Sequence, residues 1–151
     1  MIYTDNTKKA MKLMYEKHKD QYDKSGLPYV HHPLHLADQM EDETTTIVAL
    51  LHDVVEDTDT TFEELERQGF GKQVIDALKL LTHDKETDYF EYVERLSTNP
   101  IARKVKLADL THNMDITRLD TVTEKDLVRQ EKYQKCFQFL QDIESKKQLK
   151  K

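Results

Sequence analysis

The stretch that decides the fold reads Ala49-Leu50-Leu51-His52-Asp53-Val54-Val55-Glu56-Asp57-Thr58. Apolar residues run up to an adjacent His-Asp pair, and a Glu-Asp pair begins four residues after the histidine. In a helix, His52 and Glu56 would share one face, and Asp53 and Asp57 would share the neighbouring face. Burying four ionisable groups beside leucine and valine is costly unless they have partners. Because a divalent metal accepts both imidazole and carboxylate ligands, the stretch predicts a metal site rather than an exposed acidic helix end.

The composition predicts a single all-α domain. A chain of 151 residues is long enough to bury a substantial core. It contains only 3 glycines and 3 prolines, which is too few for the many turns of a sandwich or barrel. The sequence has no internal repeat and no linker. We therefore expect one helical bundle over residues 1–151, with residues 146–151 as a frayed tail.

The charge balance argues against a nucleic-acid partner. The chain has 29 acidic and 23 basic residues, a net charge of −6, whereas nucleic-acid-binding proteins usually present a basic face. A small nucleotide is still compatible with this balance, because a bound dication would offset the acidic cluster locally. Cys136 is the only cysteine, which excludes an internal disulfide and a cysteine-based zinc cluster. With no apolar signal or membrane-spanning segment, we expect a cytoplasmic protein without a membrane partner.

Apolar spacing predicts a series of amphipathic helices. The expected ranges are 5–20, 33–41, 44–57, 61–69, 71–81, 89–96, 101–118 and 124–145. Thr61 or Thr60 is expected to cap the fourth of these, and Asn99-Pro100 to start the seventh. Phe90 and Val93 should point inward. The predicted inner face of the last helix consists of Leu127, Val128, Tyr133, Phe137, Leu140 and Ile143.

The loop before the second predicted helix carries two histidines in a stiffened path. Gly26 allows an unusual backbone angle, whereas Pro28 and Pro33 restrict the chain. Pro33 also suits the first turn of the helix that follows. A histidine fixed directly before that proline is well held for ligation, although His31 and His32 alone would be interpreted as exposed loop side chains.

Four side chains form the candidate metal set, namely His32, His52, Asp53 and Asp109. Two imidazoles and two carboxylates suit Mn²⁺, Fe²⁺ or Zn²⁺, and the sequence does not choose among them. A metal held this way polarises a phosphoryl oxygen and lowers the pKa of a bound water. Glu56 and Asp57 lie one helical turn further on, so we expect them to orient that water or move its proton. The alternative role for Glu56 is a structural salt bridge.

Several polar residues near these motifs are candidates for substrate contacts. Asn113 lies one turn after Asp109 and should project beside it. His83 is expected at the rim of a pocket, and His18 on the surface or at a rim. The candidate phosphate contacts are Lys24, Arg103, Lys104 and Lys106.

Taken together and in this order, these motifs resemble the HD-domain metal-dependent phosphohydrolases, and within them the hydrolase domain of RelA/SpoT-type alarmone enzymes. The likeness covers residues 10–119. A His-Asp pair alone is a weak signal, whereas three motifs with a following Glu-Asp pair are specific. The matching segments are Pro28-Tyr29-Val30-His31-His32-Pro33, the stretch from Ala49 to Thr58, and Val105-Lys106-Leu107-Ala108-Asp109-Leu110-Thr111-His112-Asn113-Met114.

The resemblance implies an HD-type helical bundle that holds Mn²⁺. It makes His32 rather than His31 the ligand, alongside the other three candidates, and it assigns Glu56 and Asp57 to activation of the attacking water. It places Asn113 near a ribose and Lys24 in a substrate-binding loop. The implied reaction removes pyrophosphate from the 3′ position of guanosine tetra- or pentaphosphate, as in a small stand-alone alarmone hydrolase.

Two positions depart from the family pattern. The family's loop usually reads Arg-Lys-Ser-Gly, with the arginine stacked on guanine, whereas this chain has Asp23-Lys24-Ser25-Gly26. A carboxylate does not supply a guanidinium face. Asp109 is followed by Leu110, where the long enzymes often carry arginine. Base selection therefore does not transfer with the metal chemistry, and the alternative substrates are ppApp, NADPH or a nucleoside monophosphate. The non-enzymatic alternative is a nucleotide sensor, against which the Glu-Asp pair argues. Oligomeric state is not readable from the sequence.

Overall fold

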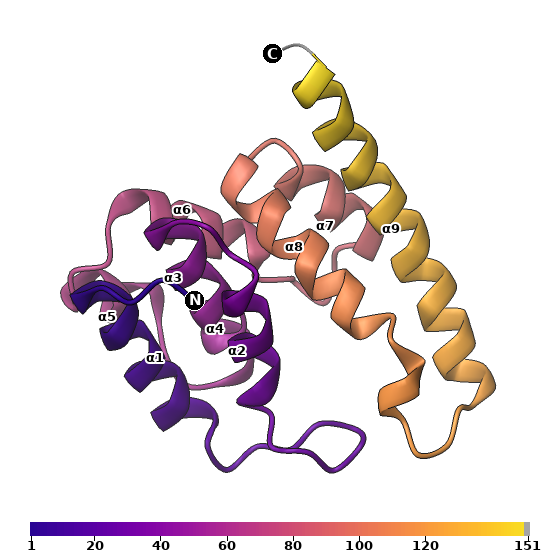
Figure 1. Ribbon diagram of the computed structural model, residues 1–151, viewed down its shortest axis with the longest axis horizontal. Coiled ribbons are helices and arrows are strands. Elements are labelled where there is room, and N and C mark those ends of the chain that lie inside the picture. Colours follow the sequence, from indigo (N-terminus) through magenta and orange to yellow (C-terminus); the bar gives the residue numbers. More distant parts are fainter. Residues whose placement is uncertain (150–151) are drawn as a thin grey trace.

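The computed structural model describes residues 1–149, with side chains described as far as residue 147 (Figure 1). Within these residues the chain forms nine α-helices and one 3₁₀-helix and has no strand, which confirms the predicted all-α class. The elements are α1 Asp5–His18, α2 His31–Asp38, α3 Glu43–Leu51, α4 Val54–Asp57, α5 Phe62–Arg67, α6 Lys72–Leu81, α7 Tyr89–Leu96, α8 Pro100–Asn113, η1 Ile116–Arg118 and α9 Glu124–Leu149. No helix in this part of the chain is both long and apolar enough to cross a membrane.

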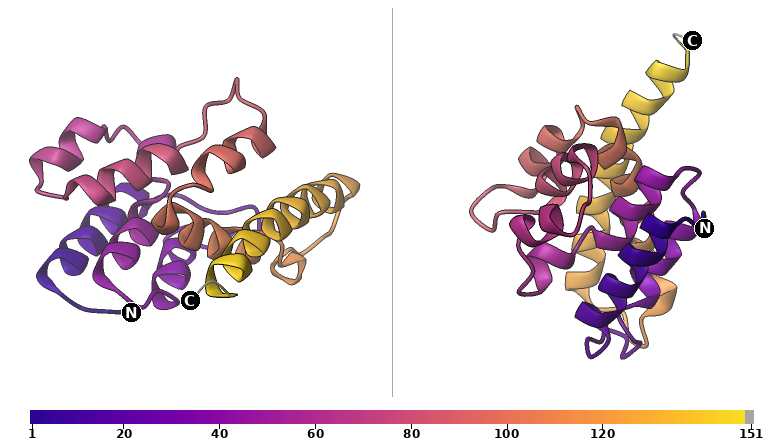
Figure 2. Two further views of the ribbon diagram at one scale, coloured as in Figure 1. Left: turned by 90° about the horizontal axis from the view of Figure 1, so that it is seen from above. Right: turned by 90° about the vertical axis from the view of Figure 1, so that its left-hand side faces the viewer.

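Helix α3 lies at the centre of the bundle. It packs against α1, α2, α6 and α8, so solvent reaches little of it (Figures 1 and 2). Every residue from Thr45 to Leu51 is buried. A leucine or valine buried in this way contributes about 1.5–3 kcal/mol relative to an exposed one. This all-round burial explains why α3 is apolar on every face and why its C-terminal end, which carries the His-Asp pair, is held in the interior.

The predicted helix over residues 44–57 is broken in the middle. Helix α3 ends at Leu51 and α4 begins at Val54, with Asp53 at φ −106° and ψ 3° between them. The ring N–H of His52 donates to the carbonyl oxygen of Ala49 at 2.7 Å, an acceptor that a continuous helix would use for a backbone amide. The expectation of shared faces along one helix is therefore wrong, and the break turns the His-Asp pair toward α8.

Capping residues at two helix starts agree with the prediction. The Thr61 side chain accepts from the backbone amide of Glu64 at the start of α5. At the start of α8, Asn99 accepts from two backbone amides and Pro100 occupies the first turn. The far end of α8 differs from the prediction, because the helix stops at Asn113 and a separate 3₁₀ turn, η1, follows.

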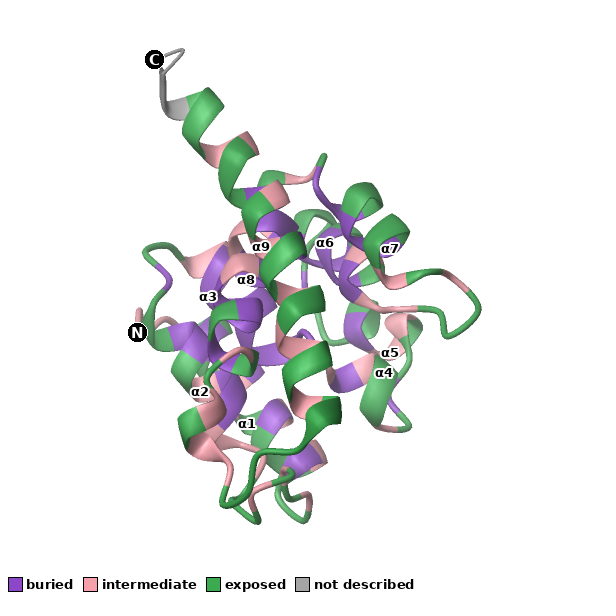
Figure 3. Ribbon diagram, turned by 90° about the vertical axis from the view of Figure 1, so that its right-hand side faces the viewer, coloured by how far each residue is buried: buried purple, intermediate pink, exposed green. Residues whose placement is uncertain are grey.

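Helix α9 lies along α8, and its last turns extend past the bundle (Figures 1 and 3). Its predicted inner face is only partly correct: Leu127 is 47% exposed and Val128 is 66% exposed, whereas Cys136 and Leu140 are buried. The helix continues to Leu149, beyond the predicted end at residue 145, and residues 150–151 of the predicted tail lie outside the described residues.

Helix α7 also differs from the prediction in its inward face. Phe90 is 38% exposed and rests against Phe139 of α9, with ring centroids 5.3 Å apart. Val93 is buried, as predicted, together with Tyr92 and Leu96. The helix is therefore rotated relative to the expected orientation, and this rotation brings Tyr89 and Tyr92 next to α8.

Candidate active site

The four predicted metal ligands meet where α2, the α3–α4 break and α8 converge. His32 Nε2 lies 2.9 Å from Asp109 Oδ1. His52 Nε2 lies 3.1 Å from Asp53 Oδ2 and 3.5 Å from Asp109 Oδ1. His32, His52 and Asp109 are buried and together could hold a metal ion, and Asp53 borders them.

The geometry around His52 calls for a cation. Its Nδ1 donates to Ala49, so in the neutral ring Nε2 carries a lone pair, and this buried atom has no hydrogen-bond partner among the described residues. The lone pair faces carboxylate oxygens of Asp53 and Asp109, so acceptors converge on one point. Burial opposes a charge on the ring, but the two carboxylates outweigh it and hold the pKa of His52 well above its usual value. A divalent metal fits this donor set.

His112 orients His32. Their Nδ1 atoms are 2.6 Å apart and their rings are stacked. Burial, reinforced by the nearby charge of Arg118, lowers the pKa of His112 to about 3, so this ring is neutral. With His32 as the donor of the shared proton, its Nε2 presents a lone pair toward Asp109. His112 lies within the third motif, but this role was not predicted for it from the sequence.

Lys106 and Asn113 hold the Asp109 carboxylate from two sides. Lys106 Nζ binds Oδ2 at 2.9 Å, and Asn113 Nδ2 donates to Oδ1 at 3.1 Å. Burial would lower the pKa of Lys106, but Asp109 outweighs it and keeps the ammonium charged. To make its predicted contact with substrate, the Lys106 ammonium would have to share its donors with the ion pair to Asp109. Asn113 is exposed and keeps the position predicted for it.

Tyr29 is a further residue of the site that the sequence analysis did not single out. Its hydroxyl donates to Asp53 Oδ2, and its ring stacks at a tilt on His18 with centroids 4.8 Å apart. His18 is 1% exposed, so its predicted surface position is wrong. Gln21 continues the chain of contacts, since it bonds the His18 ring and donates to the carbonyl of Asp57. The end of α1 therefore braces the catalytic segment.

Glu56 and Asp57 project from α4 beside Asp53, and their carboxylates are exposed. Glu56 Oε1 accepts from the backbone N–H of His83 at 2.6 Å. Within the part of the chain whose side chains are described, Glu56 forms no ion pair, which argues against a salt-bridge role. Partial desolvation and the negative charges of Asp53 and Glu56 raise the pKa of Asp57 to about 6. A carboxylate with such a pKa can exchange a proton near neutral pH.

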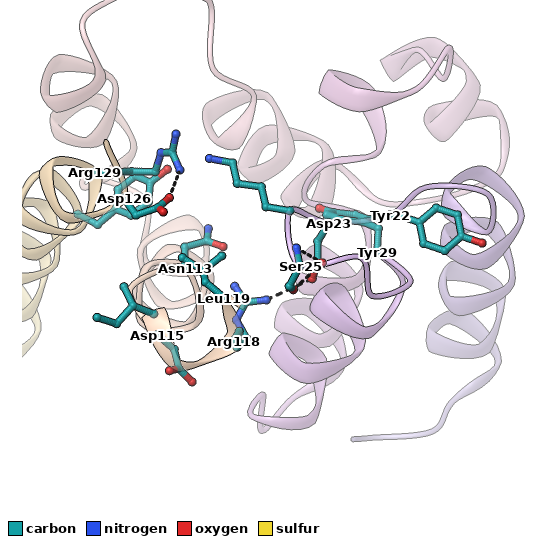
Figure 4. A pocket seen from close by; sticks show the side chains of 13 residues that line it. Tyr22, Asp23, Ser25, Tyr29, Asn113, Asp115, Arg118, Leu119, Asp126 and Arg129 are labelled. Atoms are coloured by element: carbon teal, nitrogen blue, oxygen red, sulfur yellow. Dashed lines mark hydrogen bonds and ion pairs between the residues drawn. The ribbon is translucent and has the colours of Figure 1, made fainter. Parts of the chain in front are cut away.

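Three cavities adjoin these residues, and one of them on the His32 side, of about 200 Å³, is lined by Asp23, Tyr29, His32, Asp53, Asn113 and Arg118. The metal-side cavity has a volume of about 190 Å³ and is lined by three of the four predicted ligands, His52, Asp53 and Asp109; His83 also lines it. The loop cavity has a volume of about 410 Å³ and lies between the loop after α1, η1 and the start of α9 (Figure 4). Asn113 and Tyr133 line both the loop cavity and the metal-side cavity. The loop cavity is lined by Tyr22, Asp23, Lys24, Ser25, Tyr29, Asn113, Asp115, Ile116, Arg118, Leu119, Asp126, Arg129 and Tyr133.

The predicted phosphate contacts divide between these cavities and the core. Lys24 lines the loop cavity and Lys106 the metal-side cavity. Arg103 is 2% exposed, donates to the carbonyl of Ser97 at 2.6 Å and pairs with Glu144, so its predicted role is wrong. Lys104 lies outside these cavities, and its Nζ is 3.9 Å from a carboxylate oxygen of Glu41. Its predicted role as a phosphate contact is therefore wrong as well.

With this geometry in place, the comparisons with known proteins identify the family. The profile of the HD domain matches residues 10–138. The chain belongs to the HD domain family. Its His-Asp pair lies at the α3–α4 break, and the other predicted ligands come from α2 and α8.

Relatives of this HD domain carry names that point to one chemistry. A guanosine-3′,5′-bis(diphosphate) 3′-pyrophosphohydrolase of Aquifex aeolicus is 32% identical over 145 residues, covering 88% of this chain and 20% of that one. The enzyme of that activity called MESH1 in Danio rerio is 41% identical over 119 residues, covering 68% of this chain and 64% of that one. This chain therefore spans less than two thirds of the length of either relative.

A solved structure agrees with this family assignment. It belongs to a metazoan ortholog of SpoT that is described as hydrolysing ppGpp and acting in starvation responses. It matches this chain with a TM-score of 0.75 at 27% sequence identity, covering 91% of this chain and 85% of that one. The predicted HD-type fold is thereby confirmed.

Proposed function

We propose that this HD domain, over residues 1–151, is a Mn²⁺-dependent phosphohydrolase that releases pyrophosphate from the 3′ position of (p)ppGpp or a close relative in the cytoplasm. The names of its relatives support the substrate class. The observation that carries the proposal is the buried Nε2 of His52, which has no hydrogen-bond partner in the described part of the chain and faces the Asp53 and Asp109 carboxylates beside an exposed Glu-Asp pair.

In this proposal, His32, His52, Asp53 and Asp109 hold the ion. When bound, a divalent metal supplies Lewis-acid stabilisation to the charge that develops on phosphoryl oxygens. Lys106, Tyr29 and His112 position the ligands, and ligand-positioning residues of this kind usually change metal affinity when they are altered.

The reacting groups of the chain itself are Glu56 and Asp57. They orient a water molecule for attack on the phosphorus next to the ribose 3′-oxygen, and one of them accepts its proton. The bond between that phosphorus and the 3′-oxygen breaks, the 3′-oxygen takes up a proton, and diphosphate leaves. Asn113 and Lys24 contact the nucleotide.

Base preference follows from a different part of the molecule. Asp23 accepts from the backbone amides of Ser25 and Leu27 and from the His31 ring, so its carboxylate is committed to the loop. It offers no flat cationic surface for a guanine base. Adenine-containing ppApp is therefore tested beside ppGpp.

The test is a product assay with purified protein and Mn²⁺. The substrates are ppGpp, ppApp, NADPH and a nucleoside monophosphate, and pyrophosphate and phosphate are quantified separately. We expect pyrophosphate from an alarmone, and loss of turnover with retained metal in Glu56→Ala. Phosphate as the sole product would replace the proposal with an HD nucleotide phosphatase. Metal binding without turnover would replace it with a nucleotide sensor, and full activity of Glu56→Ala would remove Glu56 from the mechanism.

A further inference from the structure

The loop between α6 and α7, residues 82–88, contacts the Glu-Asp pair of α4 at one point. There the backbone N–H of His83 donates to Glu56 Oε1 at 2.6 Å. Glu56 is exposed, and among the residues whose side chains are described its carboxylate makes no other hydrogen bond and no ion pair. An exposed glutamate without a partner exchanges among several rotamers. This single hydrogen bond therefore fixes where the Glu56 carboxylate lies.

The ring of His83 closes the loop on itself. Its Nε2 lies 2.7 Å from the carbonyl oxygen of Thr87, four residues further on. Because a carbonyl oxygen only accepts, the ring nitrogen is the donor in this bond. The backbone N–H of Thr87 in turn donates to the carbonyl oxygen of Asp84 at 3.0 Å. The shape of this turn, and with it the direction of the His83 backbone N–H, thus depends on the imidazole.

Two tyrosines of α7 hold the same ring. The His83 ring centroid lies 4.7 Å from that of Tyr92 and 5.5 Å from that of Tyr89. Tyr92 is 6% exposed, and its hydroxyl donates to the carbonyl oxygen of Leu81 at the end of α6, at 2.6 Å. The ring is therefore fixed from the core, and a continuous set of contacts leads from α7 through His83 to Glu56.

We propose that His83 is a positioning residue for Glu56. Its ring fixes the 82–88 loop, so that its backbone N–H binds Oε1 of Glu56 and leaves Oε2 to accept from the attacking water. The role of Glu56 in this inference rests on the proposed function. Orientation of a reacting group before substrate arrives acts on kcat, because the contact lies within the protein and adds nothing to substrate binding. A direct contact of His83 with substrate would instead act on KM.

The test begins with the ring. His83→Ala removes the bond to Thr87 and keeps the backbone N–H, so kcat should fall about tenfold while KM for the alarmone and the Kd for Mn²⁺ stay unchanged. His83→Gln provides an amide donor for the Thr87 carbonyl and should recover most of the lost kcat. The matched control is Glu86→Ala in the same loop. Glu86 is exposed, its side chain forms no hydrogen bond or ion pair within the described part of the chain, and its loss should leave kcat unchanged.

Two further variants show whether the effect passes through Glu56. In a Glu56→Ala background, His83→Ala should not lower the residual turnover further, because the group to be positioned is gone. His83→Pro removes the N–H itself, and Thr82, at φ −84° and ψ 112°, already has the extended conformation that precedes a proline. Its kcat should fall at least as far as that of His83→Ala, and circular dichroism checks that each variant is folded.

Three results would overturn the proposal: equal losses from His83→Ala with and without Glu56, a raised KM in place of a lowered kcat, or an unchanged kcat in His83→Ala. Each of them would mean that the loop acts on the reaction by another route or not at all.

Hydrogen exchange of the residue 83 amide, followed by NMR, tests the contact without turnover. The amide should exchange slowly in wild type and about tenfold or more faster in Glu56→Ala and in His83→Ala. If exchange follows this order while wild type releases no pyrophosphate, the proposed reaction fails and the placement of Glu56 by His83 stands. If wild type releases pyrophosphate while the amide exchanges equally fast in wild type and Glu56→Ala, the reaction stands and this inference fails.

Discussion

The metal-side cavity and the loop cavity are built in opposite ways. In the metal-side cavity the charged groups bind one another: Lys106 pairs with Asp109, and the carboxylates of Asp53 and Asp109 both face His52. In the loop cavity the carboxylates of Asp115 and Asp126 bind the backbone, and the pairs of Arg118 with Asp23 and of Arg129 with Asp126 are longer, at 3.5 Å each. A site that must hold a cation collects carboxylates and imidazoles, whereas a site that must hold an anion commits its carboxylates elsewhere. Under the proposed function, this difference would separate the reacting end of the substrate from the rest of the nucleotide.

The largest effect is expected from a substitution of Asp53, which borders the metal-side cavity. Asp53→Asn keeps the shape of the side chain but removes its charge, so metal affinity should fall and turnover should drop about a thousandfold or more. Calorimetry with Mn²⁺ and the pyrophosphate assay measure the two quantities.

Asp76→Asn provides the control for this experiment, because Asp76 is an exposed acid on α6. It should leave both metal binding and turnover unchanged. Wild-type metal affinity in Asp53→Asn would remove Asp53 from the ligand set and leave His32, His52 and Asp109 as the protein ligands.

A smaller effect should distinguish the two roles open to Lys106. If Lys106 positions Asp109, the substitution Lys106→Met should raise the metal Kd about 10–100-fold. The KM for nucleotide should then stay nearly constant at saturating metal. As a phosphate contact, it should instead raise KM and leave the metal Kd alone. Lys104→Met, on the same helix but outside both cavities, should change neither value.

The metal end was accessible from the sequence because its ligands lie in short motifs. His52-Asp53 follows an apolar run, His32 precedes Pro33, and Asp109 lies in a helix of regular spacing, so each could be recognised from its own short motif. Their grouping into one metal set was predicted from their residue types, with the resemblance implying His32 rather than His31, and the structure brings neighbouring members of the set to 2.9 and 3.1 Å from each other.

What the sequence did not reveal depends on contacts between distant elements. Tyr29 reaches Asp53 from a loop, and Arg118 reaches that loop from η1. The break between α3 and α4 was also missed, because residues 44–57 have uninterrupted helical periodicity and the bond from the His52 ring to Ala49 leaves no pattern in it. Arg103 was wrongly predicted as a phosphate contact, because no local sequence pattern indicates its buried ion pair with Glu144.

The smallest effect is expected for a substitution of Asp23, whose carboxylate accepts hydrogen bonds within the loop that lines the loop cavity. Burial raises the pKa of Asp23, but hydrogen bonds from His31 and Ser25 outweigh it and hold the pKa well below its usual value. A depressed pKa means that the ionised form stabilises the fold above an ordinary carboxylate pKa, about 4, and that this stabilisation is lost as the pH falls below it. Asp23→Asn should therefore lower the free energy of unfolding by about 1–2 kcal/mol near neutral pH.

This difference between wild type and Asp23→Asn should shrink as the pH falls below about 4, where wild type loses the same charge. Urea unfolding of the metal-free proteins over a pH series measures it, with Asp20→Asn, a nearby exposed acid, as the control. A gap that stays constant through the acid range would mean that the Asp23 carboxylate is not held by its charge. The loop would then be free to rearrange around a substrate, and the contrast between a fixed loop cavity and a fixed metal-side cavity would no longer hold.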